Sequence, residues 1–204
     1  SIAQVIESKN PNFKEGDIVE GSFGWQEYAI SDNSGIMKVN KVPSNIPITT
    51  PLSVFGITGM TAYFGLLEIG KPIQKDIVLI SGAAGSTGSI AGQIAKIKGC
   101  EVIGIAGGAE KCRWLTEKAK FDVAIDYKEA NMRQAIREVC PKGANVVFDN
   151  VGGDFLDIAL TRLSINARIV LCGAISRYNE KKLPPGPTNY MALIFMRAKM
   201  EGFI

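Results

Sequence analysis

The chain has 204 residues, enough for one domain of ordinary size or for one domain and part of a second. Its 23 Lys and Arg residues against 20 Asp and Glu give a net charge of +3 without a basic stripe, so nucleic-acid binding is not expected. The absence of histidine excludes a His-dependent triad, a histidine general base and a His-ligated metal ion within this chain.

Residues 1–50 are predicted to form short strands and turns. Strand-like runs occupy 18–21 and 26–30, turn signals occupy 14–17 and 32–35, and prolines follow at 43, 47 and 51. These few strands cannot bury a core among themselves. We therefore interpret residues 1–50 as part of a β domain and place a second domain at 51–204.

Residues 51–204 alternate apolar, strand-like runs with amphipathic segments. Strands are predicted at 76–81, 101–106, 123–125, 145–148, 168–173 and 200–204, and helices at 59–67, 86–98, 109–119, 129–139, 154–163 and 190–196. Strands that alternate with helices in this way imply right-handed βαβ crossovers. The expected fold class is therefore α/β, with a doubly wound parallel sheet of six strands, the last one truncated.

One stretch of this region, residues 77–95, contains no charged side chain. Its length matches a membrane span, but its four glycines and several hydroxyl groups make it too polar for one. The β-branched first half and the periodic second half favour a strand followed by a helix. No membrane partner is expected.

The four cysteines give no sign of a metal site or a disulfide framework. Cys100, Cys112, Cys140 and Cys172 form no C-x-x-C pair, and a chain of this length builds a core without disulfides. The first residues do not resemble a signal peptide. We expect ordinary thiols in a reducing environment, and hence a cytoplasmic protein without a bound metal.

A glycine-rich turn follows the first strand of the predicted sheet. The sequence Ala83-x-Gly85-x-x-Gly88 matches the dinucleotide-binding pattern G-x-G-x-x-G with alanine in place of the first glycine. Gly85 would let the backbone approach a pyrophosphate, and Gly88 would let the helix pack close to its strand. The amides at the helix start favour an anion. The alternative is a glycine-rich turn that binds no ligand.

The end of the second strand distinguishes the two nicotinamide cofactors. An acidic residue there would bind the adenine ribose hydroxyls, but this sequence has Ala106-Gly107-Gly108-Ala109 followed by Lys111 and Arg113. The small residues leave room for a 2′-phosphate and the two cationic side chains would attract it, so the pattern favours NADP(H). Lys111 is the stronger candidate for binding this phosphate. The alternative is that both cations lie on a solvated helix face, and Glu110 would have to point away.

Three later strand ends supply further candidates. Tyr127 follows the third strand, Asn150 the fourth, and 172–176 (Cys-Gly-Ala-Ile-Ser) the fifth. In an open α/β sheet these ends line the ligand crevice. Tyr127 would flank an adenine, or be an ordinary tyrosine at the rim. Asn150 would hydrogen-bond a ribose or a nicotinamide, or be held in an Asx turn.

Taken together, these motifs resemble a known family. The chain is similar to the zinc-independent medium-chain reductases of the prostaglandin reductase and leukotriene hydroxydehydrogenase type, and most similar to their bacterial curcumin and alkenal reductase relatives. The resemblance covers essentially the whole chain. It rests on residues 59–65, the 83–88 turn, residues 148–153 (Phe-Asp-Asn-Val-Gly-Gly), residues 172–179 and the proline-rich segment 183–187.

The resemblance implies a Rossmann domain, a partial GroES-like β domain at residues 1–50, and NADPH-dependent reduction of a carbon–carbon double bond conjugated to a carbonyl. It also implies that Tyr178 is the catalytic hydroxyl nearest the reacting carbonyl. It places Lys111 on the 2′-phosphate. The other implied cofactor-binding residues are Gly85, Ser86, Thr87, Gly88, Tyr127, Asn150, Cys172, Gly173, Ala174, Ile175, Ser176, Tyr178 and Phe203.

Two other functions remain open at this point. One is a quinone reductase, and the other is an NADPH-binding module that is catalytically incomplete. Members of the family begin well before Ser1 and continue past Ile204, so the chain is expected to be truncated at both ends. The resemblance also implies a homodimer in which the sixth strands pair edge to edge, and a small unsaturated carbonyl compound as substrate.

Overall fold

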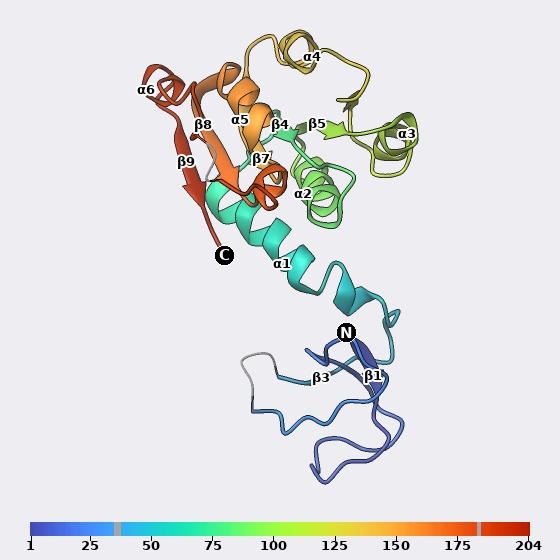
Figure 1. The fold of residues 1–204 in the computed structure, drawn as a ribbon. Helices are drawn as coiled ribbons and strands as arrows, with labels where there is room; N and C mark the ends of the chain where they lie inside the picture. The colour runs from blue at the N-terminus through green and yellow to red at the C-terminus, as the bar shows by residue number, and fades with distance from the viewer. Residues whose placement is uncertain (35–37, 183–184) are drawn as a thin grey trace. The chain divides into compact units, whose positions relative to one another are not determined.

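The computed structural model describes residues 1–34, 38–182 and 185–204, and it divides into two compact units, Ser1–Thr58 and Gly59–Ile204 (Figure 1). The predicted turn at 32–35 and the proline-rich segment at 183–187 fall partly outside the described residues. Each unit has a sheet of its own.

The first unit contains a small antiparallel sheet. Its strands are β1 (Ile2–Gln4), β2 (Ile18–Glu20) and β3 (Asn40–Lys41), with β2 in the middle. Lys41 ties β3 to the turn before β2, because its Nζ lies 2.6 Å from Oδ2 of Asp17. A short 3₁₀ helix, η1 (Thr50–Leu52), follows.

The prediction of a strand at residues 26–30 is wrong. The structure has bends and irregular backbone there, and the side chains of Trp25 and Ile30 are fully exposed. A short alternating run forms a strand only where a neighbouring strand accepts its hydrogen bonds and a core covers one face. Strands β1 and β3 were not predicted, because two or three residues are too few to produce a pattern.

The second unit contains the six-stranded parallel sheet that the sequence predicts. The strand order is β6-β5-β4-β7-β8-β9, and every neighbouring pair is parallel. The strands are β4 (Ile77–Ile80), β5 (Glu101–Ala106), β6 (Val123–Asp126), β7 (Ala144–Asp149), β8 (Leu163–Leu171) and β9 (Lys199–Gly202). The predicted doubly wound α/β fold is confirmed.

Helices cover both faces of this sheet (Figure 1). They are α1 (Ile57–Phe64), which continues into the π-helical turn η2 (Gly65–Gly70), α2 (Ser86–Ile97), α3 (Ala109–Glu117), α4 (Met132–Val139), α5 (Gly153–Leu160), the 3₁₀ turn η3 (Ile175–Arg177) and α6 (Ala192–Phe195). In the described part of the chain, no helix is both long and apolar enough to cross a membrane.

Strand β4 shows why its apolar run is continuous. Val78 and Ile80 belong to the core beneath η2, α2 and α3, whereas Leu79 belongs to the core beneath α4 and α5. All three side chains are fully buried. Successive residues of a strand face opposite sides, so a strand covered on both sides needs apolar residues at every position.

The boundary between helix α5 and strand β8 differs from the one predicted. The helix predicted to reach residue 163 ends at Leu160, and β8 begins at Leu163 rather than at 168. Leu160 and Leu163 are both buried, and their spacing fits a helix as well as a turn into a strand. The pairing of Leu163 with Ala144 on β7 decides between the two.

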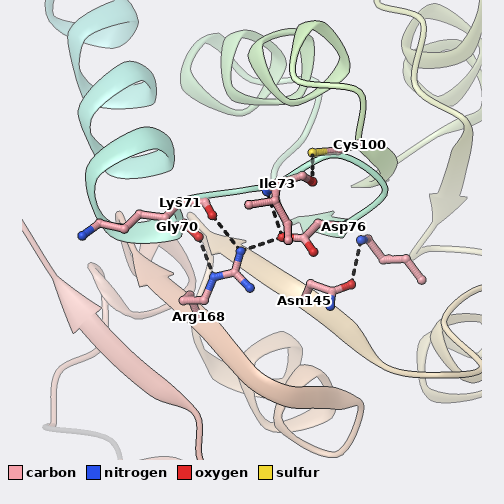
Figure 2. A network of polar contacts seen from close by, with 8 residues as sticks. Gly70, Lys71, Ile73, Asp76, Cys100, Asn145 and Arg168 are labelled. Atoms are coloured by element: carbon pink, nitrogen blue, oxygen red, sulfur yellow. Dashed lines mark hydrogen bonds and ion pairs between the residues drawn. The ribbon is translucent and has the colours of Figure 1, made fainter.

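A polar network ties η2, β4 and β8 together at the amino ends of the strands (Figure 2). Nε of Arg168 donates to the carbonyl of Gly70 at 2.7 Å, and Nη2 donates to the carbonyl of Lys71 at 2.9 Å. These bonds satisfy carbonyls at the end of η2, where Lys71 adopts a left-handed conformation with φ +44°. Nη2 also pairs with Asp76 just before β4.

Candidate functional site

A cleft of about 1200 Å³ lies at the carboxyl ends of the parallel strands. Its walls come from the loops that follow β4, β5, β6, β7 and β8, which is where open α/β sheets bind ligands. The strand order sets the order of these loops across the cleft. It runs from Tyr127 after β6, through Gly107 after β5 and Gly85 after β4, to Asn150 after β7 and Cys172 after β8.

The glycine-rich turn after β4 forms the centre of the cleft. Helix α2 begins with Gly85 as its N-cap residue, and no side chain caps it. The backbone amides of its first turn, Ser86 to Gly88, therefore lack the intrahelical partners that later amides have. All four residues line the cleft. Free amides and the positive end of the helix dipole make this turn suitable for an anion such as a pyrophosphate.

The turn forms although alanine replaces the first glycine of the motif. Ala83 is fully buried, and the turn conformation is supplied instead by Gly82, which has φ +56°. On β5, a Cβ at Gly104 would lie 2.9 Å from the Cβ of Ala83. The methyl group of Ala83 therefore occupies space that Gly104 leaves open.

Gly88 has the packing role that the motif predicts for it. A Cβ at this position would lie 2.5 Å from the carbonyl oxygen of Gly82 and 3.0 Å from Cα of Ala83. These are backbone atoms that cannot move aside independently. Helix α2 thus approaches the end of β4 more closely than any residue with a side chain would allow.

On the β5 side, the cleft is lined by a cationic side chain and by no acidic one. Lys111, in the first turn of α3, lines the cleft, and it has no ion-pair partner among the described residues. Glu110 and Arg113 are not among the residues that line the cleft. The ring of Tyr127 covers Gly107, where a Cβ would lie 2.8 Å from the ring carbon Cε1.

Asp126 holds this loop in place. Its Oδ1 accepts hydrogen bonds from the amides of Gly108 at 2.9 Å and Lys128 at 3.0 Å. These two bonds keep the pKa of Asp126 below its ordinary value. The amide of Gly108 is held in this way at a residue whose φ is +99°, a conformation that favours glycine. Asp126 was not predicted from the sequence, because an acid at the end of β6 has no local pattern that connects it to β5.

The loop after β7 is organised by a buried carboxylate. Asp149 is fully buried, and its side chain accepts hydrogen bonds from Ser81 Oγ at 2.6 Å and from the amides of Val151 at 2.9 Å and Gly152 at 3.0 Å. Burial raises the pKa of Asp149, and the three hydrogen bonds oppose that rise. Asn150, beside it, lines the cleft.

The loop after β8 brings a hydroxyl group to the cleft. Tyr178 lines the cleft, and its Oη accepts a hydrogen bond from the amide of Ala174 at 3.1 Å. Gly173 makes room for this hydroxyl, because a Cβ there would lie 3.0 Å from it. Ser176 Oγ donates to the carbonyl of Val151 at 2.6 Å, which joins this loop to the loop after β7.

Cys172 lines the same part of the cleft without being a reactive thiol. Burial, with a smaller contribution from the nearby charge of Asp149, raises its pKa to about 11. Nucleophilic chemistry requires the thiolate, which is scarce at neutral pH when the pKa is this high.

The structure therefore gathers most of the predicted site residues around one cleft. Those that line it are Gly85, Ser86, Thr87, Gly88, Lys111, Tyr127, Asn150, Cys172, Gly173, Ile175, Ser176 and Tyr178. Ala174 is not among them, although its amide holds Tyr178. Phe203 is not among them either: its ring lies against Gly65 and packs on the apolar core.

Several lining residues were not predicted to belong to the site. Some lie in motifs noted above: Thr61, Ala84, Ala106, Gly107, Val151, Gly152, Gly153 and Arg177. The others are Ser81, Gly82, Ile105, Met132, Asp154, Phe155 and Glu180. Met132 comes from a helix that no motif connects to the strand ends. A signal was available for Gly152 and Gly153, since the pair follows an apolar strand just as Gly82 does.

Proteins of known sequence and structure resemble this chain over its whole length. It is 41% identical to the NADPH-dependent curcumin reductase of Escherichia coli and 44% identical to prostaglandin reductase 1 of Bos taurus. The structure of CurA from Vibrio vulnificus in complex with NADPH is 44% identical in sequence, with a TM-score of 0.89. These matches cover 100% of this chain, which spans 60%, 62% and 61% of the three proteins, respectively.

Two family models match the sequence. The one described as "N-terminal domain of oxidoreductase" matches residues 1–39, and the one described as "Zinc-binding dehydrogenase" matches residues 86–204. The name of the second implies zinc, but the chain has no histidine, and its described residues contain no group of three Cys, Asp or Glu side chains placed to hold a metal ion. The residues that the structure describes therefore do not fit a zinc site. Because the second model covers more than half of the sequence, the chain belongs to the zinc-binding dehydrogenase family, and it is of the medium-chain reductase type that its motifs resemble.

Proposed function

We propose that the cleft binds NADP(H). The observation that carries this proposal is the uncapped amino end of α2 at the centre of a cleft whose β5 side offers Lys111 and no acid. Residues 85–88 would hold the pyrophosphate, Lys111 the 2′-phosphate and Tyr127 the adenine. Asn150 would lie along the cofactor, and residues 172–178 would run beside its nicotinamide half. Relatives that match the whole chain carry NADPH in their names or titles.

We further propose that the protein reduces a carbon–carbon double bond conjugated to a carbonyl group. Curcumin reductase, prostaglandin reductase 1 and a 2-alkenal reductase of Nicotiana tabacum are named for substrates of this kind or for their products. When bound, NADPH supplies the hydride that forms a C–H bond at the β carbon. The electron pair of the double bond then shifts toward the carbonyl oxygen, and a proton from solvent or from a protein hydroxyl completes the reduction at the α carbon.

Tyr178 is proposed to stabilise the negative charge that develops on the carbonyl oxygen. Its Oη accepts a hydrogen bond from the amide of Ala174, so its own O–H proton remains available for donation into the cleft. A donor held in place before the reaction stabilises a developing oxyanion without the reorganisation that water would need.

NADPH oxidation, measured separately with an enal, an enone and a quinone, tests this function. Consumption of NADPH with the enal or enone, together with formation of the saturated carbonyl product, supports the proposal. Turnover of the quinone alone contradicts it in favour of a quinone reductase. Tight NADPH binding without turnover of any acceptor contradicts it in favour of a binding module.

We propose four further properties of the protein. Residues 1–50 would belong to a GroES-like catalytic domain and residues 51–204 to the nucleotide-binding domain, and the reaction would proceed in the cytoplasm without zinc. The protein would be a homodimer, because β9 lies at the edge of the sheet, where a second copy of the strand can pair with it. Light scattering of the purified protein tests the dimer, and metal analysis tests the absence of zinc.

A further inference from the structure

We propose that Ser81 and Asp149 are positioning residues for the nicotinamide half of the cofactor. They would act by fixing the orientation of Asn150, the residue between the pyrophosphate turn and the loop after β8. This inference rests on the proposed NADP(H) binding.

The two side chains form a buried pair between neighbouring strands. Ser81 follows β4 and is 1% exposed, and Asp149 ends β7 and is 0% exposed. Ser81 Oγ donates to Oδ1 of Asp149 at 2.6 Å and accepts a hydrogen bond from the amide of Asn150 at 2.8 Å. Because the hydroxyl proton is directed at the carboxylate, a lone pair of Oγ is left facing the Asn150 amide.

The side chain of Asn150 is held by the same strand end. Its Nδ2 donates to the carbonyl of Ser81 at 2.7 Å. This assignment leaves Oδ1 as an acceptor for a donor in the cleft, such as a ribose hydroxyl or the carboxamide of nicotinamide. Gly82 continues from Ser81, and a Cβ on it would lie 3.5 Å from Cβ of Asn150.

A carboxylate suits this position because it only accepts hydrogen bonds. It receives the Ser81 hydroxyl and the amides of Val151 and Gly152, three donors that converge on one group. All three donors reach Oδ1, and the Gly152 amide also reaches Oδ2 at 3.1 Å. An asparagine that kept Oδ1 in place would set its NH2 group against the Gly152 amide, so that two donors face each other in a buried site. A turn of the side chain that relieves this clash would take the acceptor away from the Ser81 hydroxyl, and the orientation of Asn150 would no longer be fixed.

The strand order makes the expected effect selective for one half of the cofactor. Asn150 follows β7, whereas Lys111 follows β5 and Tyr127 follows β6, on the other side of β4. A ligand that spans the cleft across the amino end of α2 meets these groups at opposite ends. Loss of the Ser81–Asp149 pair should therefore weaken contacts to the nicotinamide half and leave contacts to the adenine half intact.

The experiment compares two probes, NADPH and adenosine 2′,5′-bisphosphate, which carries the adenine and the 2′-phosphate but no nicotinamide. Calorimetric titration of Ser81→Ala and Asp149→Asn is expected to give about a 10-fold weaker Kd for NADPH, equivalent to one lost hydrogen bond. The Kd for the bisphosphate is expected to stay within about two-fold of the wild-type value.

Two control variants separate positioning from general destabilisation. Asp157→Asn alters a carboxylate on α5 that also receives three donors, the amide and hydroxyl of Thr188 and the amide of Asn189, but does not line the cleft. Ser164→Ala removes a buried hydroxyl without a hydrogen-bond partner. Both should leave the NADPH affinity unchanged, even where Asp157→Asn lowers the unfolding midpoint as much as Asp149→Asn does.

A double-mutant cycle with Asn150→Ala tests whether the pair acts through Asn150. In the Asn150→Ala background, Ser81→Ala should cause no further loss of NADPH affinity. Fully additive losses, an equal loss for both probes, or unchanged NADPH affinity in Ser81→Ala would each overturn the positioning role. Failure of the wild-type protein to bind NADPH would instead overturn the proposed function itself. If Asp149→Asn does not fold, Ser81→Ala alone decides the question.

Discussion

Nη2 of Arg168 lies 2.6 Å from Oδ2 of Asp76, and this ion pair joins the middle of β8 to the residue that precedes β4 (Figure 2). The two side chains are 22% and 8% exposed. The same guanidinium group satisfies the carbonyls of Gly70 and Lys71 at the end of η2. One side chain thus connects three elements at the end of the sheet opposite the cleft.

Replacement of Arg168 by Met should lower the free energy of unfolding by about 3 kcal/mol, because it leaves a poorly exposed carboxylate and two carbonyls without their partner. Urea unfolding measures this change. Lys96→Met is the matched control, since it breaks the more exposed Lys96–Asp122 pair and should lower the free energy by about 1 kcal/mol or less. Similar losses in both variants would contradict the structural role of Arg168.

Lys111→Ala should weaken NADPH binding by about 10- to 100-fold while it changes NADH binding little, because a charge-assisted hydrogen bond to the 2′-phosphate is lost. Parallel titrations with the two cofactors measure this selectivity. Arg113→Ala is the control, since Arg113 lies on the same helix but does not line the cleft. An equal loss for NADPH and NADH would show that Lys111 does not recognise the 2′-phosphate.

Tyr178→Phe should lower kcat for an enone by about 100-fold, because the donor to the developing oxyanion is removed. The Kd for NADPH should remain within about two-fold of the wild-type value, since this role concerns the substrate. Steady-state kinetics and cofactor titration provide the two measurements. Tyr190→Phe, an exposed tyrosine that does not line the cleft, should have wild-type kcat. Undiminished turnover in Tyr178→Phe would refute the assignment.

Asp126 should make stability depend on pH in the acidic range. The amides of Gly108 and Lys128 keep its pKa below the ordinary value of 3.8, so the carboxylate stabilises the folded state more than the unfolded state. This contribution is fully present well above pH 3.8 and is lost as the pH falls below that value toward the lower pKa of the folded state. The difference in urea midpoint between the wild-type protein and Asp126→Asn should therefore shrink on acidification. A midpoint difference that grows on acidification would contradict the stabilising role assigned to the ionised Asp126 carboxylate.

Within the second unit, the sequence predicts the elements well and their boundaries less well. The apolar runs of β4, β5 and β7 are strong signals, because strands covered on both faces need apolar side chains at every position. The start of β8 was missed by five residues, since Leu160 and Leu163 fit a helix and a strand equally well. In the first unit, the run at 26–30 forms no strand because no neighbour pairs with it.

The sequence by itself determines the alternation of strands and helices and the glycine-rich turn at 82–88, because both depend on residues that are close together in the chain. Only the tertiary structure decides which strand ends lie side by side. The hydrogen bond between Ser81 and Asp149 joins residues 68 positions apart, and the bond between Gly108 and Asp126 joins residues 18 apart. Such contacts follow from the strand order β6-β5-β4-β7-β8-β9. They leave no periodic pattern in the sequence, because the residues around each partner reflect only the strand to which that partner belongs.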